Sequence, residues 1–282
     1  MLDVSSIAEG FFDPIVRVVD QMLEHAPVLE PDRVMLVGAW CRDTLHAALG
    51  HDFETRATRD VDIALALSGW DVYEQLARLF PAASDTGLAF RIAEMVADLI
   101  PFGELEDPVG EVHPPKGDDT ISVWAFTEIF DPARPLSLTP SLAIRCPTVP
   151  GLRRREAGRL AGSTAWGEPK DANDIALTVH RYAESSEVQD RLYESPQGSD
   201  MLLAEEVDVP RAAARLLGAD VADLIGPDRL AELLERWPGN IEMLARNFVI
   251  PAATHVPQES RRLELIQALT RGLAEPSSPT PS

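Results

Sequence analysis

Two aspartates separated by a single residue, Asp60 and Asp62, have the type and spacing of metal-binding side chains. They lie in residues 59–67, where alternation predicts a strand with both aspartates on one face and large apolar residues on the other. Like charges this close are costly unless a cation lies between them, and magnesium with hard oxygen ligands supplies that charge. The pattern predicts a magnesium site, and it is also typical of an edge strand with two solvated acids.

A third aspartate, Asp98, extends this hypothesis. Residues 91–100 are predicted to form a strand rather than a helix, because a proline and a glycine follow at once. Asp98 then shares its alternation with Glu94 and converges on the first two aspartates if the strands are neighbours. Three carboxylates on adjacent strands suit a two-metal site for in-line phosphoryl transfer. One ion would activate an attacking hydroxyl, held or deprotonated by Asp98, and the other would hold a triphosphate and its pyrophosphate leaving group.

A glycine marks the turn before these strands. Residues 33–38 contain a short apolar run that follows Arg33 and is stopped by Gly38, which predicts a buried strand, and residues 41–49 are predicted to be helical. Gly38 at the turn between them would let backbone N–H groups approach a phosphate, and the helix start would add positive potential. Gly38 and Ala39 are therefore candidate phosphate contacts through their backbone.

The segment Lys170-Asp-Ala-Asn-Asp174 contains one of only two lysines in the chain. A helix is predicted over residues 172–184, beginning near Asp171, which places Asp174 in its first turn. A carboxylate there is favoured by the helix dipole, so helix capping alone would explain both aspartates. A contact between Lys170 and an anion is the functional interpretation of the same residues.

Taken in order, these motifs resemble the nucleotidyltransferases of the AbiEii/MenT group, within the DNA polymerase β-like superfamily. The resemblance covers roughly residues 30–185. It implies a short mixed sheet bearing the acids, a helical C-terminal half, two magnesium ions during turnover and a nucleoside triphosphate as donor. Several characterised members are toxins that add nucleotides to tRNA acceptor ends, with a transcription-regulating antitoxin as partner. The motifs are Gly38-x-x-x-Arg42, Thr58-x-Asp-x-Asp62, Ala97-Asp-Leu-Ile-Pro-Phe-Gly-Glu-Leu-Glu106 and Lys170-Asp-Ala-Asn-Asp-Ile-Ala-Leu177.

The resemblance also implies roles for further residues. Lys170 would contact triphosphate oxygens and Asp174 would orient it, while Arg42 and Arg159 are additional cationic contacts. The chain departs from the family pattern at two places. Ala39 follows the glycine where many members have serine or glycine, and Arg159 stands where the family tends to carry a lysine. Arginine keeps the charge and offers a fork suited to phosphate, but its geometry differs.

Charge restricts the partners. Among 282 residues there are 46 acidic and 25 basic ones, so the formal net charge of −21 excludes nucleic-acid binding through overall charge. Residues 151–181 are the exception, because they contain six basic and four acidic residues and so carry +2. An RNA acceptor would therefore touch only this small area and be recognised at one end. The six are Arg153, Arg154, Arg155, Arg159, Lys170 and Arg181.

Other features concern the compartment. The only two cysteines, Cys41 and Cys146, form no CxxC pair, so neither a disulfide framework nor a cysteine zinc site is expected, and the compartment is predicted to be reducing. The N-terminus has no secretion signal pattern, and no apolar run approaches the roughly 18 residues of a membrane span. We expect a cytoplasmic protein with no membrane partner.

The fold class predicted is α/β (α+β). A nucleotidyltransferase domain with a short mixed sheet is expected at residues 1–150, a helical domain at 151–274 and a disordered tail at 275–282. Within the first domain we also expect helices at 7–25 and 70–80 and a strand at 120–126. Helices in the second domain are predicted to begin near Met201, Ala212, Asp228 and Glu259, separated by Gly218, Gly226 and Pro238-Gly239.

The sequence thus predicts a magnesium-dependent nucleotidyltransferase with Asp60, Asp62 and Asp98 as metal ligands. Its preferred acceptor is an RNA or tRNA 3′ end, as for a toxin of a toxin–antitoxin system. Alternative acceptors are an aminoglycoside-like small molecule or a protein side chain. A nucleotide-binding regulatory module without turnover is the alternative outside enzymology.

Overall fold

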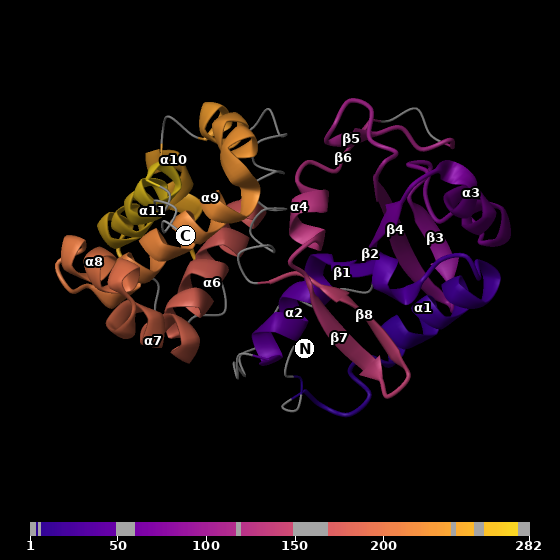
Figure 1. Ribbon diagram of the computed structural model, residues 1–282, viewed down its shortest axis with the longest axis horizontal. Coiled ribbons are helices and arrows are strands. Elements are labelled where there is room, and N and C mark those ends of the chain that lie inside the picture. The colour runs from indigo at the N-terminus through magenta and orange to yellow at the C-terminus, as the bar shows by residue number, and fades with distance from the viewer. Residues whose placement is uncertain are drawn as a thin grey trace. The chain divides into compact units, whose positions relative to one another are not determined.

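The computed structural model describes Val4 and residues 7–48, 60–116, 120–148, 169–237, 241–250 and 257–275. The chain divides into two compact units, Met1–Thr148 and Val149–Ser282, where the sequence predicts a boundary at residue 150. The first unit contains the sheet and the second is helical (Figure 1).

A six-stranded sheet organises the first unit, in the order β3-β4-β2-β1-β8-β7. β1 pairs antiparallel with β2 and parallel with β8, whereas β2 pairs parallel with β4. The predicted α/β class with a mixed sheet is therefore confirmed. The strands are β1 (Val34–Val37), β2 (Asp60–Leu67), β3 (Ala89–Ile92), β4 (Met95–Gly103), β7 (Arg134–Thr139) and β8 (Leu142–Cys146).

Helices and a hairpin cover the two faces of the sheet. On one side lie α1 (Asp13–His25) and α3 (Trp70–Leu79), and on the other lies α4 (Phe126–Phe130) (Figure 1). The hairpin of β5 (Glu111–Val112) and β6 (Ile121–Ser122) joins α4 in covering that second face. The side chains buried there form a continuous apolar cluster, which includes Met35, Val37, Ala64, Ile100, Phe102, Val112, Val123, Phe126 and Ile129.

The predicted strand at residues 91–100 is wrong in its bounds. Residues 91 and 92 are the last two residues of β3. Ala93 and Glu94 then form a turn with positive φ of 50° and 65°, and β4 continues through Pro101 to Gly103. Proline is tolerated there because the Leu99 N–H, two residues earlier, points toward the β3 side and bonds the carbonyl of Leu88. β3 has ended at that level, so position 101 has no hydrogen bond to lose.

Two other predictions fail for local reasons. The strand expected at 120–126 is limited to Ile121–Ser122, because Ala125 adopts a left-handed φ of 75° and α4 begins directly after it. The helix expected at 7–25 begins only at Asp13. Pro14 lies in the first turn of α1, where its missing N–H costs nothing, whereas it would break a longer helix.

The second unit contains α6 (Pro169–Glu184), α7 (Ser186–Glu194), α8 (Pro196–Ala204), α9 (Val209–Arg236), α10 (Ile241–Asn247) and α11 (Glu259–Ala274). α11 begins at the predicted residue. α8 and α9 begin before theirs, and each has a proline in its first turn. The expected break at Gly226 is present, with a φ of 74° inside α9.

The sequence predicts that Gly218 separates two helices, and this prediction is wrong. Gly218 lies within α9, at its contact with α11. A Cβ at Gly218 would lie 2.3 Å from the Leu269 carbonyl oxygen, and one at Gly272 would lie 1.9 Å from that of Arg215. Each glycine therefore lets the two helix backbones approach. No described helix is long and apolar enough to cross a membrane. The disordered tail is expected at residues 275–282, but Glu275 is described at the end of α11, where its carboxylate pairs with Arg215 at 2.5 Å. Residues 276–282 are outside the described residues.

Candidate active site

The structure brings Asp62 and Asp98 together on neighbouring strands. β2 and β4 are parallel, and Asp62 pairs in register with Asp98, so both side chains lie on the same face of the sheet. Both are partly exposed, while Asp60, two residues earlier on that face, is exposed at the start of β2. The neighbouring strands on which the three-acid prediction depends are therefore present.

Gly38 lies directly against Asp62. It follows Val37, the residue of β1 that pairs with Asp62, and it is the first residue of α2 (Gly38–Ala48). Its φ is +68°, and a Cβ at this position would lie 1.8 Å from Asp62 Oδ2. Glycine is required here by both backbone conformation and space. The turn thus places the first N–H groups of a helix beside a carboxylate of the sheet.

Buried packing on the opposite face holds the strand that bears Asp98. Tyr73 of α3 donates its hydroxyl hydrogen to the carbonyl of Gly87 at 2.5 Å, and its oxygen lies 3.4 Å from the carbonyl of Leu99. Burial raises the pKa of the Tyr73 hydroxyl above its usual range, and the negative charge of Asp98 raises it further. The phenol therefore stays a neutral hydrogen-bond donor, fixed beneath the residue next to Asp98.

The carboxylate oxygens of this site are the type of ligand that magnesium prefers, but the structure supports only two such ligands. Carboxylate oxygens are its preferred protein ligands, and one or two carboxylates suffice where water and phosphate oxygens complete the octahedron. In the described part of the chain, no three His, Cys, Asp or Glu side chains are grouped closely enough to hold a metal ion. The register of Asp62 with Asp98 therefore supports a two-carboxylate site, and the third ligand, Asp60, stays a prediction.

Arg42, a predicted phosphate contact, is 8% exposed on α2. Its Nε donates to Asp43 Oδ1 at 2.9 Å, so this one of the five N–H donors of the guanidinium is already bound within α2. On the same helix Cys41 is buried, with its Sγ 3.7 Å from that of Cys146 at the end of β8. The contact between the two sulfur atoms joins α2 to β8.

Lys170 and Asp174 lie in the second unit, on α6, whereas the aspartates of the sheet lie in the first. α6 begins at Pro169, so Asp174 is its sixth residue and lies beyond the turn whose N–H groups need a cap. The capping interpretation therefore does not apply to Asp174. Thr178 donates its hydroxyl hydrogen to the carbonyl of Asp174 at 3.0 Å. Arg159 lies outside the described residues.

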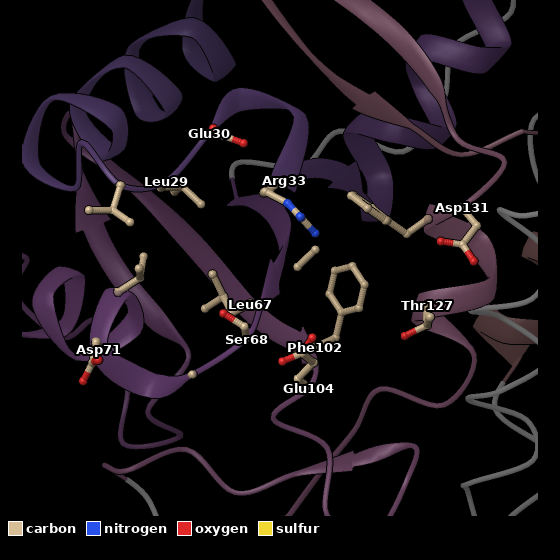
Figure 2. Close-up of a pocket in the computed structure, with 16 residues that line it drawn as sticks. Leu29, Glu30, Arg33, Leu67, Ser68, Asp71, Phe102, Glu104, Thr127 and Asp131 are labelled. Atoms are coloured by element: carbon tan, nitrogen blue, oxygen red, sulfur yellow. The ribbon is translucent and has the colours of Figure 1, made fainter.

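Sequence reasoning missed a cavity of about 520 Å³ at the other end of β2 and β4 (Figure 2). It opens where these strands end, at Leu67 and Gly103, five residues beyond Asp62 and Asp98, which is about 16 Å along the strands. It belongs wholly to the first unit. Its lining comes from the segments 28–33, 66–72, 102–104 and 127–131. Residues 102–104 belong to the motif at 97–106, whereas the other three segments contain no motif singled out in the sequence.

The sequence matches no model of a known protein family, and it matches no curated protein. The candidate active site therefore rests on the residues and the geometry described above.

Proposed function

We propose that this protein is a magnesium-dependent nucleotidyltransferase, which transfers a nucleoside monophosphate from a nucleoside triphosphate to an acceptor hydroxyl and releases pyrophosphate. The observation that carries the proposal is the register of Asp62 with Asp98 on parallel strands, beside a helix start that only glycine can form. Two carboxylates next to helix N–H groups can hold a cation and a phosphate side by side.

In this proposal different residues of the first unit bind magnesium, accept the proton of the acceptor hydroxyl and bind phosphate. Magnesium held by Asp62 and Asp98, with Asp60 as a further ligand, would supply positive charge to the phosphate oxygens. Asp98 holds the acceptor hydroxyl and accepts its proton as the hydroxyl oxygen bonds to the α-phosphorus. The bond from that phosphorus to the bridging oxygen breaks, and pyrophosphate leaves. The backbone N–H groups of Gly38 and Ala39 bind phosphate oxygens.

The remaining assignments come from the sequence resemblance. Lys170 and Arg159 contact triphosphate oxygens, Asp174 orients the lysine, and Arg42 contributes through N–H groups other than the Nε–H that binds Asp43. The assigned acceptor is an RNA 3′ end, that of a tRNA, which would make the protein a cytoplasmic toxin with a cognate antitoxin. Alternative acceptors are an aminoglycoside-like molecule or a protein side chain.

The area available to RNA is small. The net charge of −21 disfavours a broad RNA-binding face. Arg181, one of the six basic residues of the predicted patch, is only 3% exposed, so its guanidinium does not contribute to a surface patch. Recognition of one RNA end through residues 151–170 fits these facts better than binding along a duplex. The small basic area also favours the alternative of a small-molecule acceptor.

A second candidate is a module that binds a nucleoside triphosphate without turnover. Two observations favour it: the side chain of Arg42 already binds Asp43, and the described residues contain no three-ligand metal group. Such a module would still use the N–H groups beside Asp62 to hold phosphate. It would need neither an acceptor hydroxyl nor a proton acceptor at Asp98.

Transfer of label from α-³²P nucleoside triphosphates tests the proposal directly. The protein and magnesium are incubated with tRNA, with an aminoglycoside or with host protein, and the labelled product is measured. We expect Asp62→Asn and Asp98→Asn to lower the rate by about 10²–10³-fold. Asp20→Asn, which neutralises an exposed carboxylate of α1, is the matched control and should leave the rate unchanged.

The outcomes separate the two candidates. Full activity of Asp98→Asn would refute the assignment of the site. Absence of labelled product with every acceptor, together with a nucleotide-dependent rise in melting temperature that Asp62→Asn abolishes, would favour the binding module. Regulated expression in a bacterial host tests the toxin assignment, because growth arrest must depend on Asp62 if transfer causes it.

A further inference from the structure

The cavity at the end of β2 and β4 has an apolar floor and a charged rim (Figure 2). Leu29, Leu67 and Phe102 line it and are at most 7% exposed, so they form a buried apolar surface beneath the opening. Its volume of about 520 Å³ is within the range of pockets that bind small organic molecules. The cavity can therefore bury the apolar part of an organic ligand.

The rim carries excess negative charge. Four acidic side chains and one basic side chain line the cavity, so its formal charge is −3. All five are exposed, and none forms an ion pair with any residue that the structure describes. Their charges are thus not neutralised within the described parts of the chain. These rim residues are Glu30, Asp71, Glu104, Asp131 and Arg33.

The distribution of these acids distinguishes an organic cation from a metal ion. A metal site built from protein ligands alone, without phosphate oxygens, requires several carboxylates that converge on one point, and no such group of three occurs among the described residues. Instead the acids come from four separate segments around the opening. Dispersed carboxylates over an apolar floor suit a chain of methylene groups with several ammonium groups along it.

Arg33 specifies the ligand further. In Figure 2 its guanidinium lies in the centre of the view near Phe102, with Thr127 and Asp131 on one side and Ser68 on the other. A positive group bound next to Arg33 would be repelled. Ammonium groups should therefore lie beside the rim carboxylates and away from the Arg33 guanidinium, with methylene groups passing over Phe102.

We propose that this cavity binds a linear polyamine, held by the exposed carboxylates of the rim with its methylene chain on the Leu29–Leu67–Phe102 floor. The proposal does not rest on the proposed nucleotidyltransferase activity, because the cavity and the acid pair lie at opposite ends of the strands. Amines of this class are protonated at neutral pH, so their charges complement the rim. Through this cavity the protein would respond to the polyamine concentration independently of Asp62 and Asp98.

Calorimetric titration of the full chain with spermidine at low salt tests this site. We expect the double variant Glu104→Gln/Asp131→Asn to raise the dissociation constant at least tenfold. Asp20→Asn, which removes an exposed carboxylate outside the cavity, should leave it unchanged, and so should Asp62→Asn. If Asp20→Asn weakens binding as much as the rim variant does, spermidine binds the acidic surface generally and the proposal is wrong.

Two further variants make the test specific. Arg33→Gln should tighten spermidine binding several-fold because it removes the repelling charge, whereas loss of binding in this variant would contradict the cation assignment. Gly69→Leu should weaken binding at least tenfold by filling the opening. Gly69 lines the cavity in an extended conformation, and a Cβ there would meet no heavy atom within 4 Å, so the variant should fold. Unchanged affinity in a folded Gly69→Leu protein would show that spermidine does not bind in this cavity, and the proposal would be wrong.

Discussion

Carboxylates have different surroundings in the two units of the molecule. In the helical unit Glu205 is 1% exposed and contacts three arginines, Arg211, Arg215 and Arg271, at distances of 2.7–3.4 Å. In the α/β unit the acids of the cavity rim are exposed and have no ion-pair partner among the described residues. A carboxylate surrounded by arginines serves stability, whereas an exposed acid without such partners can accept a charged ligand.

The comparison predicts its largest effect at Glu205. Glu205→Gln should destabilise the helical unit by about 3 kcal/mol, because three arginines lose the buried charge that compensates them. Urea unfolding followed by circular dichroism measures this change. A loss below about 0.5 kcal/mol would show that the arginines are solvated well enough without Glu205, and the distinction between the two units would disappear.

Gly38→Ala should have the next largest effect, about 2 kcal/mol of stability in the α/β unit. The new methyl group would overlap Asp62, and alanine would have to adopt a φ of +68°. The matched control is Gly69→Ala, where a Cβ meets open space and the backbone is extended. Thermal unfolding of both variants measures the difference. Equal melting temperatures would contradict the close contact between Gly38 and Asp62.

Such contacts between distant segments are what the sequence predicts least well. Alternation in residues 59–67 correctly places Asp60 and Asp62 on one face, because that pattern depends only on neighbours in the chain. The register of Asp62 with Asp98 depends on how two strands meet, which neither strand encodes alone. The turn at Ala93 and Glu94 is missed because both adopt positive φ without being glycine or asparagine.

The ion pairs of Glu205 and the cavity both arise from contacts between segments that are distant in the sequence. Arg271 reaches Glu205 from a helix 66 residues away in sequence, and no local pattern indicates that contact. The cavity likewise combines four segments whose residues are individually ordinary. Composition could predict an acidic protein, but only the packed structure distinguishes acids neutralised by arginine from acids left at an opening.

Asp208 offers a smaller test, through pH. Its carboxylate accepts the backbone N–H of Arg211 at the start of α9 and lies 2.7 Å from the guanidinium of Arg261. The hydrogen bond from Arg261 holds the pKa of Asp208 below its usual value. A pKa lowered in the folded state contributes stability that is present above pH 4 and lost as pH falls through the folded pKa.

The variant Asp208→Asn should therefore reduce stability at pH 7 by about 1 kcal/mol or less, as expected for a change of cap and loss of a partly exposed ion pair. The reduction should shrink as the solution is acidified below pH 4, since the wild-type carboxylate is then protonated as well. Unfolding curves at pH 7, 4 and 3 measure this trend. A difference that stays constant with pH would mean that the charge of Asp208 is not what stabilises the start of α9.

The smallest effect is expected at the cavity rim. Glu104→Gln is the same chemical change as Glu205→Gln, but Glu104 is exposed and has no ion-pair partner among the described residues, so stability should change by less than about 0.5 kcal/mol. Because the rim acids repel one another, the sign should be neutral or slightly stabilising. If Glu104→Gln instead cost as much as Glu205→Gln, the rim would be a structural ion network. The polyamine site would then lose the unpaired charge on which it depends.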